Sequence, residues 1–584
     1  MATQPPTYRF GEFSLEAADR RLFRNSAEVT LRPKAFDTLR CLVVRHGHTV
    51  RKEELFEAVW AGTFVSDAVL THCITEIRQA LRDDPCAPRF VRTLPKVGYS
   101  FIADVELAAA PADEAPFLRS ALEVPPASAI AVLPFVNLSA DPDNEYFCDG
   151  LSEELINGLT KIPELRVVAH SSSFSFKGRD ADVREIGRQL GVGSILEGSV
   201  RKAGGRLRIS AQLIDTTGGF HAWCEQYDRD LGDVFALQDE ISRSVLAALK
   251  VKLAGPVRAP LITASTVSMD AYLLYLQGRA YWHRRFEGVL QKAMACFEQA
   301  IQKDPGFALA YSGLADCFGS LAVWAFVPPH DAFPKAAALA RQALDMNPAL
   351  AEGYTSAALV HLFYDWDWQA TERDLARSLD LNPGSSITHL MAGHYLSVVG
   401  RFDEAIAEVL QAQALDPLSP VVNPNVGWTF YLAGRHDRAR EELERVLLRF
   451  PESLMTHFYL GYVWAALGRL DEALASLRVA SESSGGMPFA AESAGWVLAM
   501  QGRRDEARRV LSASLARAAT TYVPTSAIAL IHLGLGDDEA LFACLDRCVE
   551  ERDAMLAWAK FMPVFDRVRP DPRFQAILSR IGLA

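Results

Sequence analysis

The phrase Gly468-Arg469-Leu470-Asp471-Glu472-Ala473 decides the fold of the second half of the chain, because close copies of it begin at residues 400, 434 and 502. Successive copies are 34 residues apart, and Gly536 continues the series without the rest of the phrase. A second series follows at steps of 34 or 35 residues: Pro348, Pro383, Pro417 and Pro451. Self-similarity at a fixed period of this size predicts a stack of helical hairpins.

Each repeat predicts two amphipathic helices. The glycine lies in the turn between them, where a positive φ is needed, and the proline ends the second helix. The alanine of the phrase lies where the two helices cross closely. A single helix pair cannot bury its apolar face alone, so neighbouring pairs must stack into a solenoid. The tail from Phe565 to Phe574, with a short helix after it, is expected to cap the last repeat.

This array, over residues 270–550, resembles the tetratricopeptide repeat family. The resemblance implies a concave surface that binds a partner protein or peptide, whereas a plain scaffold or a dimerisation arm is the alternative. Tryptophans recur at helical spacing, and we expect them to be packing residues instead of a ligand cage: Trp324, Trp366, Trp368, Trp428, Trp464 and Trp496.

The first 105 residues predict a small sheet, three helices and a hairpin. Residues 7–31 alternate short apolar stretches with turns, which is typical of antiparallel strands. Helices are expected over 33–45, 52–60 and 66–81, and the hairpin over 90–101. The third helix has one buried face at the spacing i, i+4, i+7 and i+11, formed by Leu70, Ile74, Ile77 and Leu81.

Sheet, helices and hairpin in this order resemble the OmpR/PhoB-type winged helix-turn-helix, the effector domain of phosphorelay regulators. The phrases that carry the resemblance are residues 31–39, 65–71 with 77–81, and 93–99. The resemblance implies that the third helix enters the major groove of double-stranded promoter DNA and that the hairpin touches the adjacent minor groove. The implied contacts are Thr71, His72, Thr75 and Glu76 to bases, Arg78 to phosphate, and Thr93 and Lys96 from the wing.

The chemistry of these side chains suits that task, although two positions depart from the family. Threonine can bond base edges, and glutamate can accept from a cytosine amino group. Thr75 and Glu76 stand where many response regulators have consecutive arginines, and Pro95 replaces the wing arginine, with Lys96 next. The first 105 residues carry a net charge of +2, from 15 Lys and Arg against 13 Asp and Glu. We therefore expect weak, salt-sensitive DNA binding per monomer.

Residues 129–253 predict an α/β domain with mixed strands. A helix is expected over 150–161 with Asp149 as its cap, and His170 beside Ser171-Ser172-Ser173 is expected in a loop. Residues 131–137, 149–155 and 197–201 resemble the TolB N-terminal-like domain. No phosphate loop, HExxH motif or GxSxG motif occurs in the chain, so we predict no catalytic residue, cofactor or metal site.

Composition divides the 584 residues into three domains. Ala/Pro-rich stretches predict linkers at 106–128 and 254–266, which bound domains at 1–105, 129–253 and 267–584. Hydrophobic residues are 49% and charged residues 23%, as in soluble globular proteins. Nine cysteines without a CxxC pair indicate reduced thiols. No signal peptide and no run of about 18 apolar residues is visible, so we expect a cytoplasmic protein without a membrane span.

Taken together, the sequence predicts a multidomain protein: a winged helix, an α/β middle domain and an all-α solenoid. It resembles HilA-like and CadC-like one-component regulators, without a transmembrane helix. By the same resemblance the loop from Trp60 to Phe64 touches RNA polymerase, whereas a plain connector is the alternative. We predict a sequence-specific transcriptional regulator and no enzyme activity, with a homodimer left open. The alternative is a repeat scaffold whose winged helix no longer binds DNA.

Overall fold

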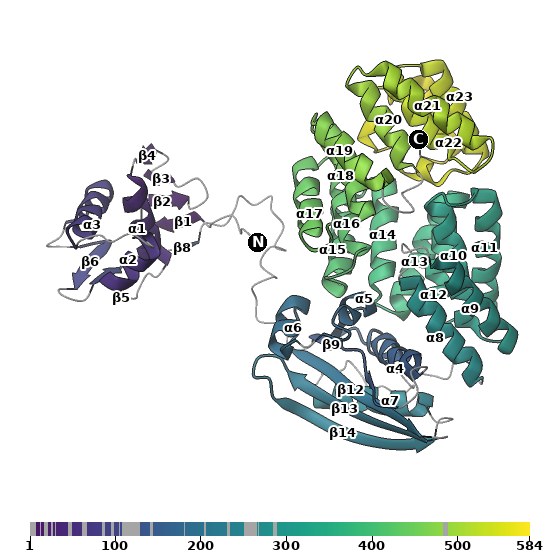
Figure 1. Ribbon diagram of the computed structural model, residues 1–584, viewed down its shortest axis with the longest axis horizontal. Coiled ribbons are helices and arrows are strands. Elements are labelled where there is room, and N and C mark those ends of the chain that lie inside the picture. Colours follow the sequence, from purple (N-terminus) through teal and green to yellow (C-terminus); the bar gives the residue numbers. More distant parts are fainter. Residues whose placement is uncertain are drawn as a thin grey trace. The chain divides into compact units, whose positions relative to one another are not determined.

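The computed structural model of the chain forms two compact units, Met1–Glu123 and Val124–Ala584 (Figure 1). It describes residues 7–11, 13–16, 21–24, 27–29, 31–44, 49–60, 67–84, 88–94, 98–103, 106–107, 129–139, 144–179, 181–203, 206–230, 234–249, 266, 268–283, 289–482 and 489–583. Within these ranges, every helix is too short or too polar to cross a membrane.

The first unit is a winged helix built from two antiparallel sheets and three helices. One sheet has the strand order β4-β3-β2-β1-β8, and the other has the order β5-β7-β6. The strands are β1 Thr7–Phe10, β2 Phe13–Glu16, β3 Arg21–Arg24, β4 Ala27–Val29, β5 Thr49–Arg51, β6 Val91–Leu94, β7 Gly98–Phe101 and β8 Glu106–Leu107. The helices are α1 Pro33–Val44, α2 Lys52–Trp60 and α3 Asp67–Leu81.

The three predicted helices and the hairpin of this unit are confirmed, and β8 is an addition. Glu106 pairs with Arg9 and Leu107 pairs with Tyr8, so the sheet includes the first two residues of the predicted linker. The pairing partner lies almost a hundred residues earlier in the chain, and for this reason local composition does not reveal it. Phe10, Phe13 and Phe101 are fully buried between the two sheets, with ring centroids of Phe10 and Phe101 5.0 Å apart.

The middle region is an α/β domain with a mixed sheet, as predicted, and helices cover both faces of the sheet. Its strand order is β11-β9-β12-β13-β14, with β10 paired to β12; β9 runs parallel to β11 and β12, and β12, β13 and β14 are antiparallel. The strands are β9 Ala129–Val132, β10 Val136–Asn137, β11 Arg166–Val167, β12 Ser194–Ala203, β13 Arg206–Asp215 and β14 His221–Asp230. The helices are α4 Asn144–Leu159, α5 His170–Phe174, α6 Val183–Leu190 and α7 Val234–Ala248. Helices α4 and α7 share one core with the sheet, and α6 packs in a second core on its other face.

Two local predictions in this region are wrong. Asp149 is not a cap, because α4 begins at Asn144, where the buried Phe147 and Cys148 extend its apolar face. His170 is not in a loop but opens α5. The Asp416 carboxylate orders this short helix by accepting from the Ser172 backbone N–H at 3.1 Å and its hydroxyl at 2.5 Å. That contact spans more than 240 residues, so no local pattern could predict it.

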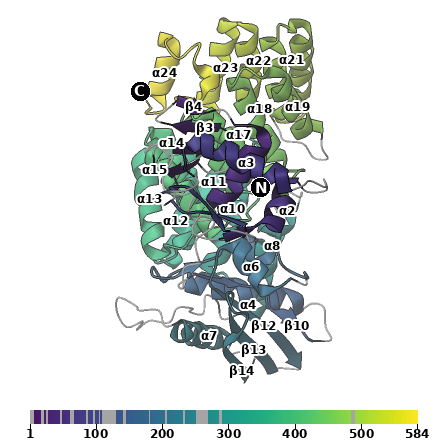
Figure 2. The ribbon, with the colours of Figure 1, turned by 90° about the vertical axis from the view of Figure 1, so that its left-hand side faces the viewer.

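Paired helices from α8 to α23 form the repeat region, stacked one after another along the molecule (Figure 2). They are α8 Met269–His283, α9 Leu290–Lys303, α10 Ala308–Val323, α11 Pro329–Met346, α12 Ala351–Val360 with the π-turn η4 His361–Asp365, α13 Trp368–Leu381, α14 Ser386–Val399, α15 Phe402–Leu415, α16 Val422–Leu432, α17 His436–Arg449, α18 Leu454–Ala466, α19 Leu470–Glu482, α20 Ala490–Met500, α21 Arg504–Ala518, α22 Thr525–Leu535 and α23 Asp538–Glu550.

The roles predicted for the repeated residues are confirmed. The five glycines of the series have φ between +70° and +84°, the left-handed region that glycine adopts without strain. Ala405, Ala439, Ala473 and Ala507 are fully buried at the helix crossings. The second helices α11, α13, α15 and α17 each end two residues before the proline of the series.

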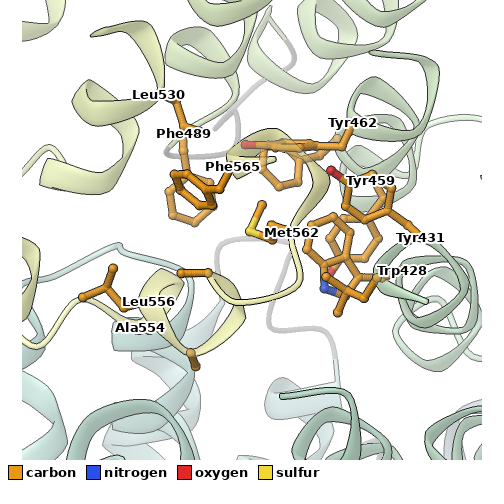
Figure 3. Packing of buried hydrophobic residues seen from close by; sticks show 14 of the residues in the cluster. Trp428, Tyr431, Tyr459, Tyr462, Phe489, Leu530, Ala554, Leu556, Met562 and Phe565 are labelled. Atoms are coloured by element: carbon orange, nitrogen blue, oxygen red, sulfur yellow. The ribbon is translucent and has the colours of Figure 1, made fainter. Parts of the chain in front are cut away.

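The tail does more than cap the last repeat. It contains η5 Ala554–Trp558, η6 Pro563–Phe565 and α24 Pro572–Arg580, and it runs along the inner face of the repeats. Figure 3 shows Met562 among the rings of Trp428, Tyr459 and Tyr462. Met562 is fully buried, and the indole N–H of Trp368 donates to the Ile581 and Gly582 carbonyls at 3.1 and 3.0 Å. The tail therefore covers part of the inner face, whereas binding of a partner protein or peptide by a concave surface of the repeats stays a prediction.

Candidate nucleic-acid interface

Helix α3 presents two chemically different faces. Leu70, Ile74, Ile77 and Leu81 are at most 2% exposed and pack against α1 and the sheets. On the opposite side Thr71, His72 and Thr75 are exposed to solvent, as is Gln79. The spacing read from the sequence therefore places these polar side chains together on one exposed face of the helix.

The hydroxyl of Thr75 is held in one orientation by its own helix. It donates to the Thr71 carbonyl at 2.9 Å. This bond to the residue four positions earlier uses the hydroxyl hydrogen, so Thr75 offers its oxygen lone pair and its methyl group to a ligand. The methyl group of Thr75 can pack against a thymine methyl, and its oxygen can accept from a base amino group.

Glu76 is less available than the threonines. Its Oε1 accepts from the backbone N–H of Arg32 at 2.7 Å, and its Oε2 lies 3.9 Å from Arg32 Nε. The side chain is 21% exposed. An ionised carboxylate has about four lone-pair sites, so the one described hydrogen bond leaves capacity for a base amino group. The same contact holds the start of α1 against α3.

Arg78 links α3 to the wing. Its Nη2 donates to the Val91 carbonyl at 2.9 Å and to the Thr93 hydroxyl at 2.8 Å. Two residues predicted from different segments, Arg78 and Thr93, are thus brought into direct contact. Among the described residues, the buried Nε of Arg78 has no hydrogen-bond partner. The guanidinium therefore sets the angle between helix and hairpin, and keeps donors that could reach a phosphate.

Asp83 is a positioning residue that the sequence analysis missed. It lies just after α3, and its carboxylate accepts from the backbone N–H groups of Arg89, Phe90 and Val91 at 2.6, 3.2 and 2.8 Å. These bonds order the entry into β6 and so place the wing. An aspartate between a helix and a hairpin is the signal that could have indicated this role.

Two predicted features cannot be located. Lys96, with its neighbours Pro95 and Val97, lies outside the described residues, as does most of the loop from Trp60 to Phe64. The exposed cations near the described part of the interface are Arg32, Lys34, Arg82, Arg89 and Arg92. They give the small domain several positions from which to neutralise phosphate.

Among the described residues, one group of potential metal ligands is present outside this interface: Glu153, His170 and His283. Arg279 Nε donates to Glu153 Oε1 at 3.0 Å, and the two imidazoles stack with centroids 3.9 Å apart and planes at 10°. The guanidinium of Arg279 neutralises the carboxylate of Glu153, and the two side chains form an ion pair between α4 and α8.

Two family models match the chain. Residues 26–101 match the family "Transcriptional regulatory protein, C terminal", and residues 427–488 match a tetratricopeptide repeat family. These matches agree with the winged helix and the paired helices described above. The remaining resemblance, of the middle region to the TolB N-terminal-like domain, stays a prediction.

The chain is also similar to named proteins over parts of its length. It is 38% identical over 246 residues to "Putative adenylate cyclase 3" of Rhizobium meliloti, which covers 41% of this chain and 40% of that protein. It is 23% identical over 412 residues to "Transcriptional regulator HilA" of Salmonella typhimurium, 70% of each chain. The solved DNA-binding domain of E. coli CadC is 30% identical, with a TM-score of 0.17, over 18% of this chain and 100% of that domain. The match thus spans less than half of the length of the Rhizobium meliloti protein.

Proposed function

We propose that this chain, a DNA-binding regulator of the OmpR type with a tetratricopeptide-repeat region, is a one-component transcriptional switch. In this proposal α3 reads promoter DNA in the major groove, and the middle domain with the repeats receives the signal. RNA polymerase is the proposed partner of the loop after α2. The observation that carries the proposal is the exposure of Thr71, His72 and Thr75 opposite a fully buried apolar stripe.

The proposed division of labour follows the chemistry of each side chain. Thr71, His72, Thr75 and Glu76 contact base edges and set specificity. Arg78 contacts phosphate while it holds the wing, and Thr93 and Lys96 contact the backbone or the minor groove.

Selection of DNA from a random library by the full chain tests this proposal. We expect an enriched sequence motif and an affinity that falls as salt rises. Arg78→Ala should weaken binding to all sequences, and Thr75→Ala should mainly change the preferred base at one position. The matched control is Arg508→Ala, an exposed arginine on α21, which should leave DNA binding unchanged. Failure to enrich any sequence would favour the alternative of a repeat scaffold.

A further inference from the structure

The inner face of the repeats retains a cavity of about 160 Å³ beside the tail. Its wall is rich in aromatic side chains, which include Trp282, Trp324, Phe363, Trp428, Tyr459 and Trp558. First helices of successive repeats provide most of this wall, and η5 of the tail provides Met555 and Trp558. An engineered apolar cavity of about 150 Å³ is large enough to bind benzene, so this space suits a ligand with one or two flat rings.

His394, a residue of this wall, has a ring nitrogen that can accept a hydrogen bond from a ligand. The amide of Asn425 donates to the Val421 carbonyl at 2.8 Å, and its Oδ1 accepts from Tyr459 Oη at 3.1 Å. His394 Nε2 lies 3.2 Å from the same Oδ1, so this nitrogen carries the hydrogen and donates. The remaining ring nitrogen, Nδ1 of His394, has no partner among the described residues. A ligand N–H would satisfy it.

A second, polar cavity of about 130 Å³ adjoins the first between the repeats and the middle region. Trp282, Asp316 and Thr355 line both cavities. Asp316 accepts from the Ser356 hydroxyl at 2.6 Å and is therefore held in place at the junction. Asp553 also lines the aromatic cavity, where its carboxylate accepts from the backbone N–H groups of Ser526 and Met555 at 3.2 and 3.0 Å. Asp316 is the carboxylate that the two cavities share.

The polar cavity carries an excess of negative charge. Its carboxylates are Glu153, Asp316, Glu352 and Asp416, and its basic side chains are Arg279, His170 and His283, the last of which lies 3.4 Å from Glu153. Arg279 is paired with Glu153 at 3.0 Å. Burial lowers the pKa of His170, which lines the same space, well below its ordinary value, so that imidazole adds no charge. Charge complementarity thus favours a cationic group on the ligand.

We propose that these joined cavities bind a small arylalkylamine, with its rings against the aromatic wall and its ammonium at Asp316. Aromatic faces also attract a cation held near them. The ammonium group donates to the carboxylate of Asp316, and a ring N–H of the ligand donates to Nδ1 of His394. That this ligand is the signal of the switch rests on the proposed function, whereas binding itself does not.

Calorimetric titration of the full chain with three probes of matched shape tests the site. Tryptamine carries a cation, indole is neutral, and indole-3-propionate carries an anion. We expect binding in the order tryptamine, indole, indole-3-propionate, with at least about tenfold between the first and the last because the acid excess attracts one and repels the other. Equal binding of the cation and the anion, or binding of none of the three, would overturn the proposal.

Two variants locate the site within the repeats. Asp316→Asn should weaken tryptamine about tenfold and leave indole unchanged, because asparagine keeps the acceptor for Ser356 and loses only the charge. Ser320→Leu should fill part of the aromatic cavity and weaken all three probes while the chain stays folded. The matched control is Asp505→Asn, an 87% exposed carboxylate on α21, which should change nothing. Unchanged binding to Ser320→Leu would remove the cavity as the site.

Measurement of DNA affinity with and without tryptamine separates the two proposals. A change in affinity of the full chain for its selected DNA supports the ligand as the signal. Tryptamine binding without such a change keeps the site and overturns its role as the signal. Tryptamine binding by a chain that selects no DNA keeps the site and rejects the proposed function.

Discussion

The polar face of α3 and the inner face of the repeat helices differ in what covers them. On α3, Thr71, His72 and Thr75 face solvent, while one stripe of the helix is buried. On α16, by contrast, every residue from Val422 to Leu432 is buried, partly beneath the tail (Figure 3). A helix with a single apolar stripe leaves its other side free for a ligand, whereas a helix that is apolar all round must be covered.

This difference decides where an external partner can bind. The polar face of α3 is exposed, so a ligand that contacts Thr71, His72 and Thr75 displaces no packed side chain of its own domain. The inner face of the repeats is occupied by side chains of the tail, including Leu556, Met562 and Phe565, in one continuous core. A protein partner would have to displace that core, whereas a small molecule needs only the cavity that remains.

The largest effect should come from placing a charged side chain on the inner face of the repeats, where the tail covers it. Met562→Asp places a carboxylate at a fully buried position among Trp428, Tyr459 and Tyr462. Burying an unpaired polar or charged group in a well-packed core costs about 4 kcal/mol of the free energy of unfolding. Urea unfolding followed by tryptophan fluorescence measures it. Met500→Asp, at a methionine that is 44% exposed, is the control and should cost under about 0.5 kcal/mol. Equal costs would mean that the tail does not cover the groove in solution.

A second prediction concerns two neighbouring buried carboxylates on α4. Burial alone would raise the pKa of Glu153, but Arg279 and His283 lower it below the ordinary carboxyl range. Burial and the adjacent Glu153 instead raise the pKa of Glu154 to about 7. The folded chain therefore binds this proton more tightly than the unfolded chain does. The contribution of Glu154 to the free energy of unfolding is therefore fully present at pH values below the pKa of this carboxyl in the unfolded chain. It is lost as the pH rises through about 7.

Glu154→Gln should remove that loss, because the amide stays neutral. We expect equal free energies of unfolding for variant and wild type at pH 4.5, and a gain of about 3 kcal/mol for the variant at pH 8, since each pKa unit corresponds to about 1.4 kcal/mol. Urea titrations at the two pH values measure it. Glu298→Gln, an exposed glutamate on α9, is the control. A gain that is the same at both pH values would show that titration is not its cause.

A third prediction tests how Arg78 contributes to DNA binding by the exposed face of α3. Arg78→Ala removes both bonds that hold the wing, at Val91 and Thr93, together with the proposed phosphate contact. DNA affinity should fall by about tenfold or more for every sequence. Arg78→Lys keeps the charge but cannot reproduce the planar fork, so its affinity should lie between those of wild type and Arg78→Ala. If lysine restored full affinity, the wing contact would have no part in DNA binding.

Local periodicity explains why so much of the fold could be predicted. The stripe on α3, the glycines with positive φ and the alanines at helix crossings all depend on neighbours within about 40 residues. The contacts that were missed connect distant segments. Examples are Asp416 with Ser172, Trp368 with Ile581, and Leu107 with Tyr8.

The same distinction applies to the candidate interface. Helical spacing placed Thr71, His72 and Thr75 on one face, but it could not show that Arg78 reaches across to Thr93 or that Glu76 holds Arg32. One signal of the covered groove was nevertheless present. Residues 422–432 and 454–466 contain no Asp, Glu, Lys or Arg, so neither helix has a charged side for solvent. This composition indicates a cover, although it does not say which segment provides it.

The smallest expected effect separates the two groups that Thr75 offers to DNA. Its hydroxyl hydrogen is used by the Thr71 carbonyl at 2.9 Å, so the methyl group is the part that the duplex meets without competition. Thr75→Val keeps a methyl group and should retain the preference for thymine at the contacted position, whereas Thr75→Ala should lose about 1 kcal/mol of it. Selection from a library randomised at that position gives both values. Loss of the preference in both variants would mean that the oxygen reads the base, and no loss in either would place the contact elsewhere on α3.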